Sequence, residues 1–332
     1  MKITLKNLGK SVLRIVGALA LMVVLASFGY ILWQPGEEAP LPQFKANAIW
    51  LGHGWLGDDA WFVRNRRDRA DFRSEKKIAA LFAELSRRKI SLVYPHLCPA
   101  QYHGEIAPYS DEQLELFLDF AAPNEIKVIP WVGGVRGESV RLASAKWRCG
   151  FIASVEKLLR DHPRLAGVQV NIEPLPSGDA RFLQLLTELR SALGPGKILS
   201  VAAYPPPTGW HRFPEVHWEL EYLQKVARYA DQIVVMMYDT AIPLEKFYVK
   251  LMIGWTKELS EALCRSKVQL IAGVPAYEDA GVGYHHPRVE NLSSALRGIA
   301  ASGAADKLAG IAIYCEWEMD DAKWRIWDQF IR

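Results

Sequence analysis

Three polar side chains alternate with aliphatic ones between residues 166 and 174. Gln169, Asn171 and Glu173 fall on one side of this stretch, and Glu173 directly precedes Pro174. A period of two is typical of a β-strand. An apolar strand carries polar side chains only where one face opens onto a site, because burying an unpaired polar group is unfavourable. The sequence therefore predicts a site at the end of this strand, with Glu173 as its acid.

The chemistry that suits such an acid is proton transfer. Burial raises the pKa of a carboxylic acid, so that it still carries its proton near neutral pH. Cleavage of a glycosidic bond needs an acid to protonate the leaving oxygen and a group to stabilise an oxocarbenium-like centre. Glu173 is the only carboxylate in the strand. We therefore interpret Glu173 as a general acid/base.

Short apolar runs that end in a turn or a polar cluster recur along the chain and predict the strands that position this acid. There are eight of them, near residues 47–52, 90–95, 126–132, 167–173, 197–204, 232–239, 268–274 and 309–315. Stretches with helical spacing separate most of them, at 76–88, 111–120, 151–160, 180–193, 219–229 and 292–302. Alternation of strand and helix predicts parallel βαβ units, and eight units predict a (β/α)8 TIM barrel over residues 46–332.

An open, doubly wound α/β sheet is the alternative architecture. Such sheets usually carry a glycine-rich phosphate-binding turn after the first strand. Here the glycines at 52–57 are followed by Asp58 and Asp59, whose charge is wrong for a phosphate. The closed barrel is therefore favoured.

The N-terminal segment has the pattern of a membrane anchor. Lys2, Lys6, Lys10 and Arg14 lie within residues 1–14, and residues 15–33 contain no charge. Such a length nearly spans a hydrocarbon core of about 30 Å. Positive residues on the N-terminal side predict a cytoplasmic N-terminus, a single crossing and an extracytoplasmic barrel. A cleaved signal peptide is the alternative, although no small-x-small cleavage site follows the apolar run. Residues 34–45, with three prolines, are expected to be a semi-rigid linker.

The strand at 166–173 resembles the signature strand of the family-18 glycoside hydrolases, the chitinase-like enzymes. Their pattern is Asp-Gly-x-Asp-x-Asp-x-Glu. In this chain Glu173 is kept, and Ala166, Gln169 and Asn171 replace the three Asp residues. The resemblance implies a TIM-barrel glycoside hydrolase whose acid is retained and whose supporting carboxylates are changed.

Further motifs of that family match at the ends of other predicted strands. The third strand of the family ends Ser-x-Gly-Gly, and here Trp131 occupies the Ser position before the glycines at 133–134. The sixth strand reads Met-x-Tyr-Asp, which Met236, Tyr238 and Asp239 match. These matches extend the resemblance well beyond one strand.

The last two strands continue the pattern. Gly-x-Pro-x-Tyr of the seventh strand is matched in full and ends at Tyr277, while Tyr314 stands where the eighth strand of the family ends in a Trp. The resemblance covers about residues 46–321. Position at the strand ends makes a set of side chains candidates for sugar binding, namely Gln169, Trp131, Tyr204, Met236, Tyr277, Tyr314 and Trp317.

The resemblance also implies a mechanism. In that family the 2-acetamido oxygen of the substrate attacks the anomeric carbon, the substrate-assisted exception among glycosidases. Asn171 would accept a hydrogen bond from the acetamide N–H, as in the similar Asn-x-Glu arrangement of the family-85 endo-β-N-acetylglucosaminidases. Tyr238 would donate to the acetamide carbonyl. Asp239 would bind a sugar hydroxyl or serve as a second carboxylate.

Other functions stay open beside a membrane-anchored hydrolase acting on a β-linked, N-acetylhexosamine-containing glycan. One alternative is a catalytically inactive, lectin-like barrel, which the lost Asp residues favour. The other is a two-carboxylate glycosidase that uses Glu173 and Asp239. A net charge of +3 does not support nucleic-acid binding. The cysteines have no metal-site spacing, so no metal or cofactor is expected. We interpret His96, His103 and the pair at 285–286 as polar surface residues.

Overall fold

The computed structural model describes residues 5–209, 215–279, 281 and 283–331. Two compact units make up the chain, Met1–Glu37 and Glu38–Arg332. The first contains helix α1 (Leu5–Leu32), in which Val12–Leu32 is long and apolar enough to cross a membrane. This length and composition suit a membrane anchor and a signal sequence alike. Lys2 of the predicted basic segment and Arg332 at the end of the predicted barrel lie outside the described residues.

The second unit is built on a closed ring of parallel strands. Strand β1 pairs with both β2 and β9, which closes the sheet, and the remaining pairs follow chain order. Strands β3 and β4 both pair with β2 and share one place in the ring, because Pro130 lies between them and has no N–H to donate. The strands are β1 (Ala48–Leu51), β2 (Leu92–Leu97), β3 (Lys127–Val128), β4 (Trp131–Val135), β5 (Gly167–Glu173), β6 (Ile198–Ala203), β7 (Gln232–Met236), β8 (Gln269–Pro275) and β9 (Gly310–Tyr314).

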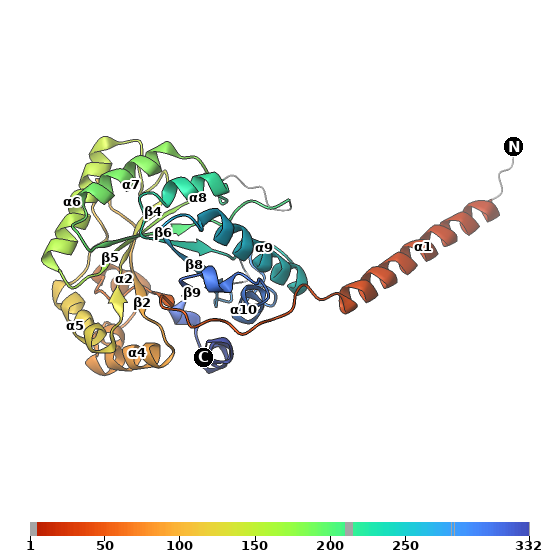
Figure 1. The fold of residues 1–332 in the computed structure, drawn as a ribbon, viewed down its shortest axis with the longest axis horizontal. Coiled ribbons are helices and arrows are strands. Elements are labelled where there is room, and N and C mark those ends of the chain that lie inside the picture. The colour runs from red at the N-terminus through yellow and green to blue at the C-terminus, as the bar shows by residue number, and fades with distance from the viewer. Residues whose placement is uncertain (1–4, 210–214, 280, 282, 332) are drawn as a thin grey trace. The chain divides into compact units, whose positions relative to one another are not determined.

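Helices surround the strands, which confirms the predicted (β/α)8 barrel (Figure 1). The six predicted helical stretches correspond to α4 (Glu75–Arg87), α5 (Asp111–Ala121), α6 (Ala145–Asp161), α7 (Ala180–Ala192), α8 (Leu220–Val226) and α10 (Leu292–Ala300). Helices that the sequence analysis did not single out are α2 (Asp59–Asn65), α3 (Ala70–Arg73), α9 (Glu245–Leu263) and α11 (Asp321–Phe330). For α9 the signal was present, since Tyr248, Met252 and Trp255 recur at helical spacing and are buried.

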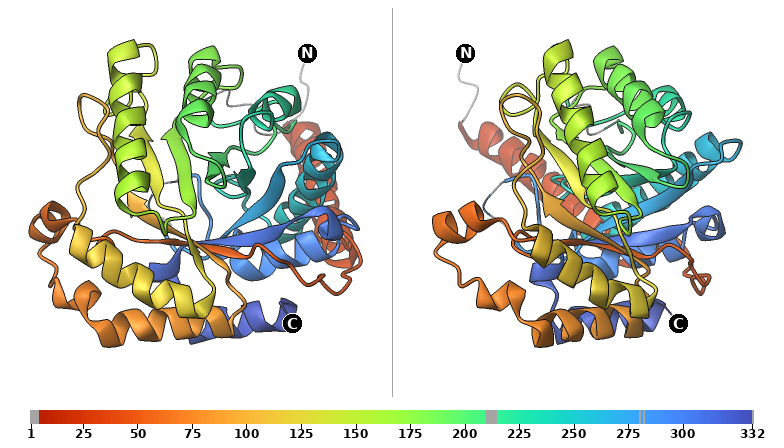
Figure 2. Two further views of the ribbon diagram at one scale, coloured as in Figure 1. Left: turned by 60° about the vertical axis from the view of Figure 1, so that its left-hand side comes forward. Right: turned by 90° about the vertical axis from the view of Figure 1, so that its left-hand side faces the viewer.

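The barrel has an outer and an inner core. Val168, Val170 and Ile172 of β5 belong to the large apolar layer that also contains the buried faces of the helices. A smaller cluster that contains Trp50 and Tyr94 draws on most of the strands. Alternation along each strand therefore sends aliphatic side chains out to the helices and larger or polar side chains into the ring. Figure 2 shows the helices packed on the outside of the strands.

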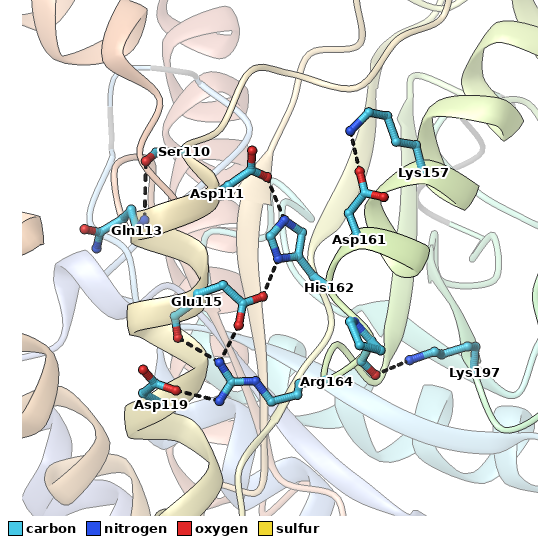
Figure 3. A network of polar contacts seen from close by, with 11 residues as sticks. Ser110, Asp111, Gln113, Glu115, Asp119, Lys157, Asp161, His162, Arg164 and Lys197 are labelled. Carbon is cyan, nitrogen blue, oxygen red and sulfur yellow. Dashed lines mark hydrogen bonds and ion pairs between the residues drawn. The ribbon is translucent and has the colours of Figure 1, made fainter.

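A polar network holds the segment that leads into β5 (Figure 3). The His162 ring nitrogens lie 2.8 Å from Asp111 Oδ1 and 2.5 Å from Glu115 Oε1, both on α5. Arg164 also contacts Glu115, and Lys197 Nζ donates to two backbone carbonyls of the same segment at 2.6 Å each. These contacts fix the start of the strand that carries the predicted acid at its far end.

Candidate active site

Glu173 ends β5 at the carboxyl edge of the barrel, the edge where (β/α)8 enzymes carry their active sites. Tyr204, one residue beyond β6, donates from its hydroxyl to Glu173 Oε2 at 3.0 Å. Burial raises the pKa of Glu173, hydrogen bonds from Asn171 and Tyr204 oppose that rise, and the charge of Asp239 adds to it. The resulting pKa lies above the ordinary value, which is the direction a general acid requires.

Asn171 lies two residues before the acid on the same face of β5. Its side chain bonds Glu173, while its Oδ1 atom is buried and has no hydrogen-bond partner among the residues the structure describes. The neighbouring Gly133 of β4 has φ +136°, and a Cβ there would lie 1.9 Å from the Asn171 carbonyl oxygen. Glycine at 133 therefore lets β4 approach β5 beside the acid.

Aromatic side chains form one connected group at the same edge. The Tyr238 ring stacks on Tyr314 with centroids 5.4 Å apart, and Tyr277 meets both edge-on at 5.8 and 5.4 Å. Trp131 approaches Tyr314 edge-on at 6.5 Å, and its buried Nε1 has no partner within the described part of the chain. Burial raises the pKa of Tyr238 well above its ordinary value, so its hydroxyl keeps its proton. Trp317 adds a 48% exposed ring that contacts Tyr314 edge-on at 5.6 Å.

Asp239 follows β7 with a left-handed backbone, φ 61°, which Asp tolerates better than most residues. The Tyr277 hydroxyl donates to its Oδ1 atom. The side chain is 37% exposed, and its negative charge contributes to the raised pKa of Glu173. Asp239 is thus electrostatically coupled to the predicted acid, and Tyr277 fixes its orientation.

Two of the predicted sugar-binding residues lie deeper in the barrel. Gln169 is fully buried, and its amide accepts from Trp50 Nε1 at 2.7 Å and donates to Ser200 Oγ at 3.2 Å. Met236, at the end of β7, is also buried. With both ends of its amide bound inside the ring, Gln169 supports the base of the site, in contrast to the sugar contact expected from its position on the polar face.

Two histidines extend the aromatic group toward β1 and β2. The His53 ring lies 3.4 Å from His96, and His96 lies 4.5 Å from Trp131, measured between centroids. Burial lowers the pKa of His53 to about 4 and holds the pKa of His96 well below its ordinary value, so both rings are neutral. The interpretation of His96 as a polar surface residue is wrong, because His96 belongs to β2 and pairs in register with Trp131.

Glu316 was not singled out as a site residue by the sequence analysis. It begins the short helix η3 (Glu316–Glu318), where Trp55 Nε1 donates to its Oε2 at 3.3 Å. Burial raises its pKa to about 6. The only indication of a functional role in the sequence was its position directly after the eighth predicted strand, 309–315. That position alone does not distinguish a site residue from an exposed surface charge.

Comparison with solved structures finds the same fold in two chitinases and a spore cortex-lytic enzyme. The Bacillus megaterium QM B1551 spore cortex-lytic enzyme SleL is 13% identical with a TM-score of 0.59, over 89% of this chain and 76% of that one. A chitinase from Chromobacterium violaceum ATCC 12472 is 16% identical with a TM-score of 0.56, over 86% and 99%. The Ostrinia furnacalis Group IV chitinase is 15% identical with a TM-score of 0.58, over 86% and 99%.

Sequence comparison places this fold in a family. A search of curated proteins finds no match. The family model for glycosyl hydrolases family 18 matches residues 77–316, more than half of the chain and most of its barrel. At 13–16% identity the structural neighbours show the shared fold, and the family model shows the relationship. The chain belongs to glycosyl hydrolases family 18.

Proposed function

We propose that this protein is a membrane-anchored glycoside hydrolase that acts outside the cytoplasm on a β-linked glycan containing N-acetylhexosamine. One observation carries the proposal. Glu173 lies at the carboxyl edge of the barrel with a raised pKa, and beside it the buried Asn171 Oδ1 has no partner among the described residues. An unpaired buried acceptor is unfavourable unless a ligand supplies a donor. The N–H of a 2-acetamido group is such a donor.

In the first step Glu173 protonates the glycosidic oxygen. The bond between that oxygen and the anomeric carbon breaks, and the carbonyl oxygen of the substrate's acetamide attacks the same carbon to give an oxazolinium ion. Asn171 Oδ1 accepts from the acetamide N–H and orients it. The Tyr238 hydroxyl, which keeps its proton, donates to the acetamide carbonyl. The departing sugar leaves as an alcohol, and Glu173 is left as a carboxylate.

In the second step water attacks the anomeric carbon from the face that the leaving group vacated. The Glu173 carboxylate takes the proton from that water, and the acetamide oxygen leaves the anomeric carbon. Two inversions give net retention of configuration. Tyr277, Tyr314, Trp131 and Trp317 would offer their rings to the apolar faces of the sugar, and Tyr204 would steady the acid.

The N-terminal segment supports an anchored protein. Residues 15–33 are uncharged and follow a basic segment, and α1 contains a span of membrane length. The positive-inside rule then puts residues 1–14 in the cytoplasm and the barrel on the other side. We propose residues 34–45 as the linker and residues 46–332 as the hydrolase domain.

Steady-state assays on N-acetylglucosamine oligomers and peptidoglycan test the proposal. We expect turnover with retention, and we expect Glu173→Gln to lower kcat by about 10²–10⁴-fold, the usual contribution of a general acid. Turnover that survives Glu173→Gln would contradict the assignment of the acid. Binding without turnover in the unmutated protein would instead support the lectin-like alternative.

An oxazoline-like inhibitor separates the two hydrolytic mechanisms. It should block the substrate-assisted reaction, because it mimics the oxazolinium ion. Cleavage that resists the inhibitor but requires Asp239 would favour the two-carboxylate mechanism. The electrostatic coupling of Asp239 to Glu173 is the observation that supports this second mechanism.

A further inference from the structure

A buried histidine and a buried glutamate lie behind Asp239. His285 Nδ1 is 3.4 Å from Asp239 Oδ1 and 3.9 Å from Glu290 Oε2. The side chains of His285 and Glu290 are 0% exposed, whereas that of Asp239 is 37% exposed. The backbone N–H of Thr240 donates to Glu290 Oε2 at 2.9 Å. The segment after β8 therefore reaches back to the residue that follows Asp239.

The positions of the two ring nitrogens determine where a proton must lie. His285 Nε2 is 3.2 Å from the backbone carbonyl oxygen of Tyr277. A carbonyl oxygen only accepts, so Nε2 carries a hydrogen. In a neutral ring Nδ1 would then be a bare acceptor facing two carboxylates. This arrangement is stable only if one further proton resides on Nδ1 or on Glu290.

We infer that His285 and Glu290 together hold this proton and thereby position Asp239 for the reaction. The inference rests on the proposed function and takes Asp239 as a residue that binds a sugar hydroxyl, the role that the family resemblance implies. An imidazolium ring at His285 balances the Asp239 charge and holds its Oδ1 atom against the ring, on the side where Tyr277 also donates. His285 and Glu290 are positioning residues, since neither is placed against the substrate.

The groups around the pair are compatible with one further proton on His285 or Glu290. Asp239 faces it from the loop after β7, Tyr277 from the segment after β8 and Tyr248 from α9. Burial raises the pKa of both tyrosines, so their hydroxyls stay neutral. Burial also raises the pKa of Glu290 to about 7. For His285 burial acts downward, but Asp239, Glu290 and the Tyr277 carbonyl raise its pKa above the ordinary value.

Loss of the proton would affect the loop directly. A neutral ring would leave Asp239 and Glu290 as two carboxylates without a cation between them, and like charges this close repel. Asp239 already has a left-handed backbone, and the N–H of Ala241, two residues later, donates to the Tyr284 carbonyl at 2.8 Å. We therefore expect the Asp239 carboxylate to move and kcat to fall as His285 loses its proton, in addition to the fall caused by the loss of the Glu173 proton.

The experiment uses the full-length protein in detergent micelles with nitrogen-15 in its histidine rings. NMR titration reports which ring nitrogen is protonated and at what pH, and His285→Asn identifies the resonances. In the unmutated protein we expect His285 to titrate above the ordinary histidine value and to keep its proton on Nε2. Glu290→Gln keeps an acceptor for Thr240 and should lower the pKa of His285 by about one unit, the effect of removing one nearby anion.

The same variants are then assayed for kcat against pH. We expect Glu290→Gln to move the part of the alkaline limb that follows His285 to lower pH, by the shift seen in the NMR titration. Glu258→Gln, on the exposed part of α9, should leave both the pKa of His285 and the limb unchanged. The inferred proton on His285 or Glu290 would be refuted if His285 is neutral and protonated on Nδ1. It would also be refuted if Glu290→Gln leaves the pKa of His285 unchanged. If Glu290→Gln shifts the pKa of His285 but leaves the alkaline limb of kcat in place, the positioning role of the pair would be refuted. Absence of turnover in the unmutated protein would refute the proposed function and leave the NMR result decisive for the pair.

Discussion

Tyr204→Phe removes one hydroxyl from the candidate active site and leaves the ring in place. That hydroxyl donates to Glu173 Oε2 at 3.0 Å, and the Tyr204 side chain is buried. The bond stabilises the carboxylate form of Glu173, so it holds the pKa below the value that burial alone would set. Its removal should therefore raise the pKa of the acid.

The size of the shift follows from the strength of the bond. A hydrogen bond to a charged group contributes about 1.5–3 kcal/mol, and about 1.4 kcal/mol corresponds to one pKa unit. Tyr204→Phe should raise the pKa of Glu173 by about one to two units. A general acid must be protonated to act, so the alkaline limb of kcat/KM should move to higher pH by the same amount.

The measurement is kcat/KM against pH on an N-acetylglucosamine oligomer, since this ratio reports the free enzyme. Tyr222→Phe is the matched control, because the Tyr222 hydroxyl donates at 2.9 Å to the backbone carbonyl of Asp179 and makes no contact with the acid. An alkaline limb that stays in place or moves to lower pH would refute the reasoning. An equal shift in the control would show that the change is not specific to Glu173.

Two further predictions concern the frame that holds the site. Gly133→Ala would place a Cβ 1.9 Å from the Asn171 carbonyl oxygen. It should therefore lower kcat/KM by at least about 10²-fold, because the strand would be misplaced. Gly254→Ala is the control, since a Cβ there meets open space, and a fully active Gly133→Ala variant would contradict the packing argument. His162→Ala should lower the free energy of unfolding by about 1–3 kcal/mol, since it leaves Asp111 and Glu115 without their buried partner. Urea titration should show little change for exposed Lys157→Ala, and equal losses in both variants would argue against the network.

The barrel was predictable because its signal is periodic and local. Each strand is an apolar run bounded by polar or turn residues, and the helical spacing between runs leaves little choice but parallel βαβ units. The place of Glu173 at the end of a strand was predictable for the same reason, because the alternating apolar residues before it mark that strand. The division of the third predicted strand into β3 and β4 was harder to predict, although Pro130 between them was visible in the sequence.

The partners of the site residues were not predictable, because they come from distant parts of the chain. Gln169 lies 119 residues from Trp50, whose indole fixes its amide. The polar face of β5 indicated that Gln169 points into the ring but not how deep it lies. Likewise the interpretation of His285 as a polar surface residue is wrong, because the return of its segment to Thr240 buries it together with Glu290. Periodicity reports which face a residue occupies, whereas contacts depend on the closure of the whole ring.

The neutral residues at three positions change how the acidity of Glu173 is controlled. Where the family pattern has Asp, this chain has Ala166, Gln169 and Asn171, so β5 supplies no charge beneath the acid. The rise in the pKa of Glu173 then comes first from burial, and the negative charge that adds to it belongs to Asp239, which follows β7. The carboxylate charge that acts on Glu173 thus comes from the loop after β7 and not from its own strand. A group that changes the position or charge of Asp239 would therefore also change the pKa of Glu173.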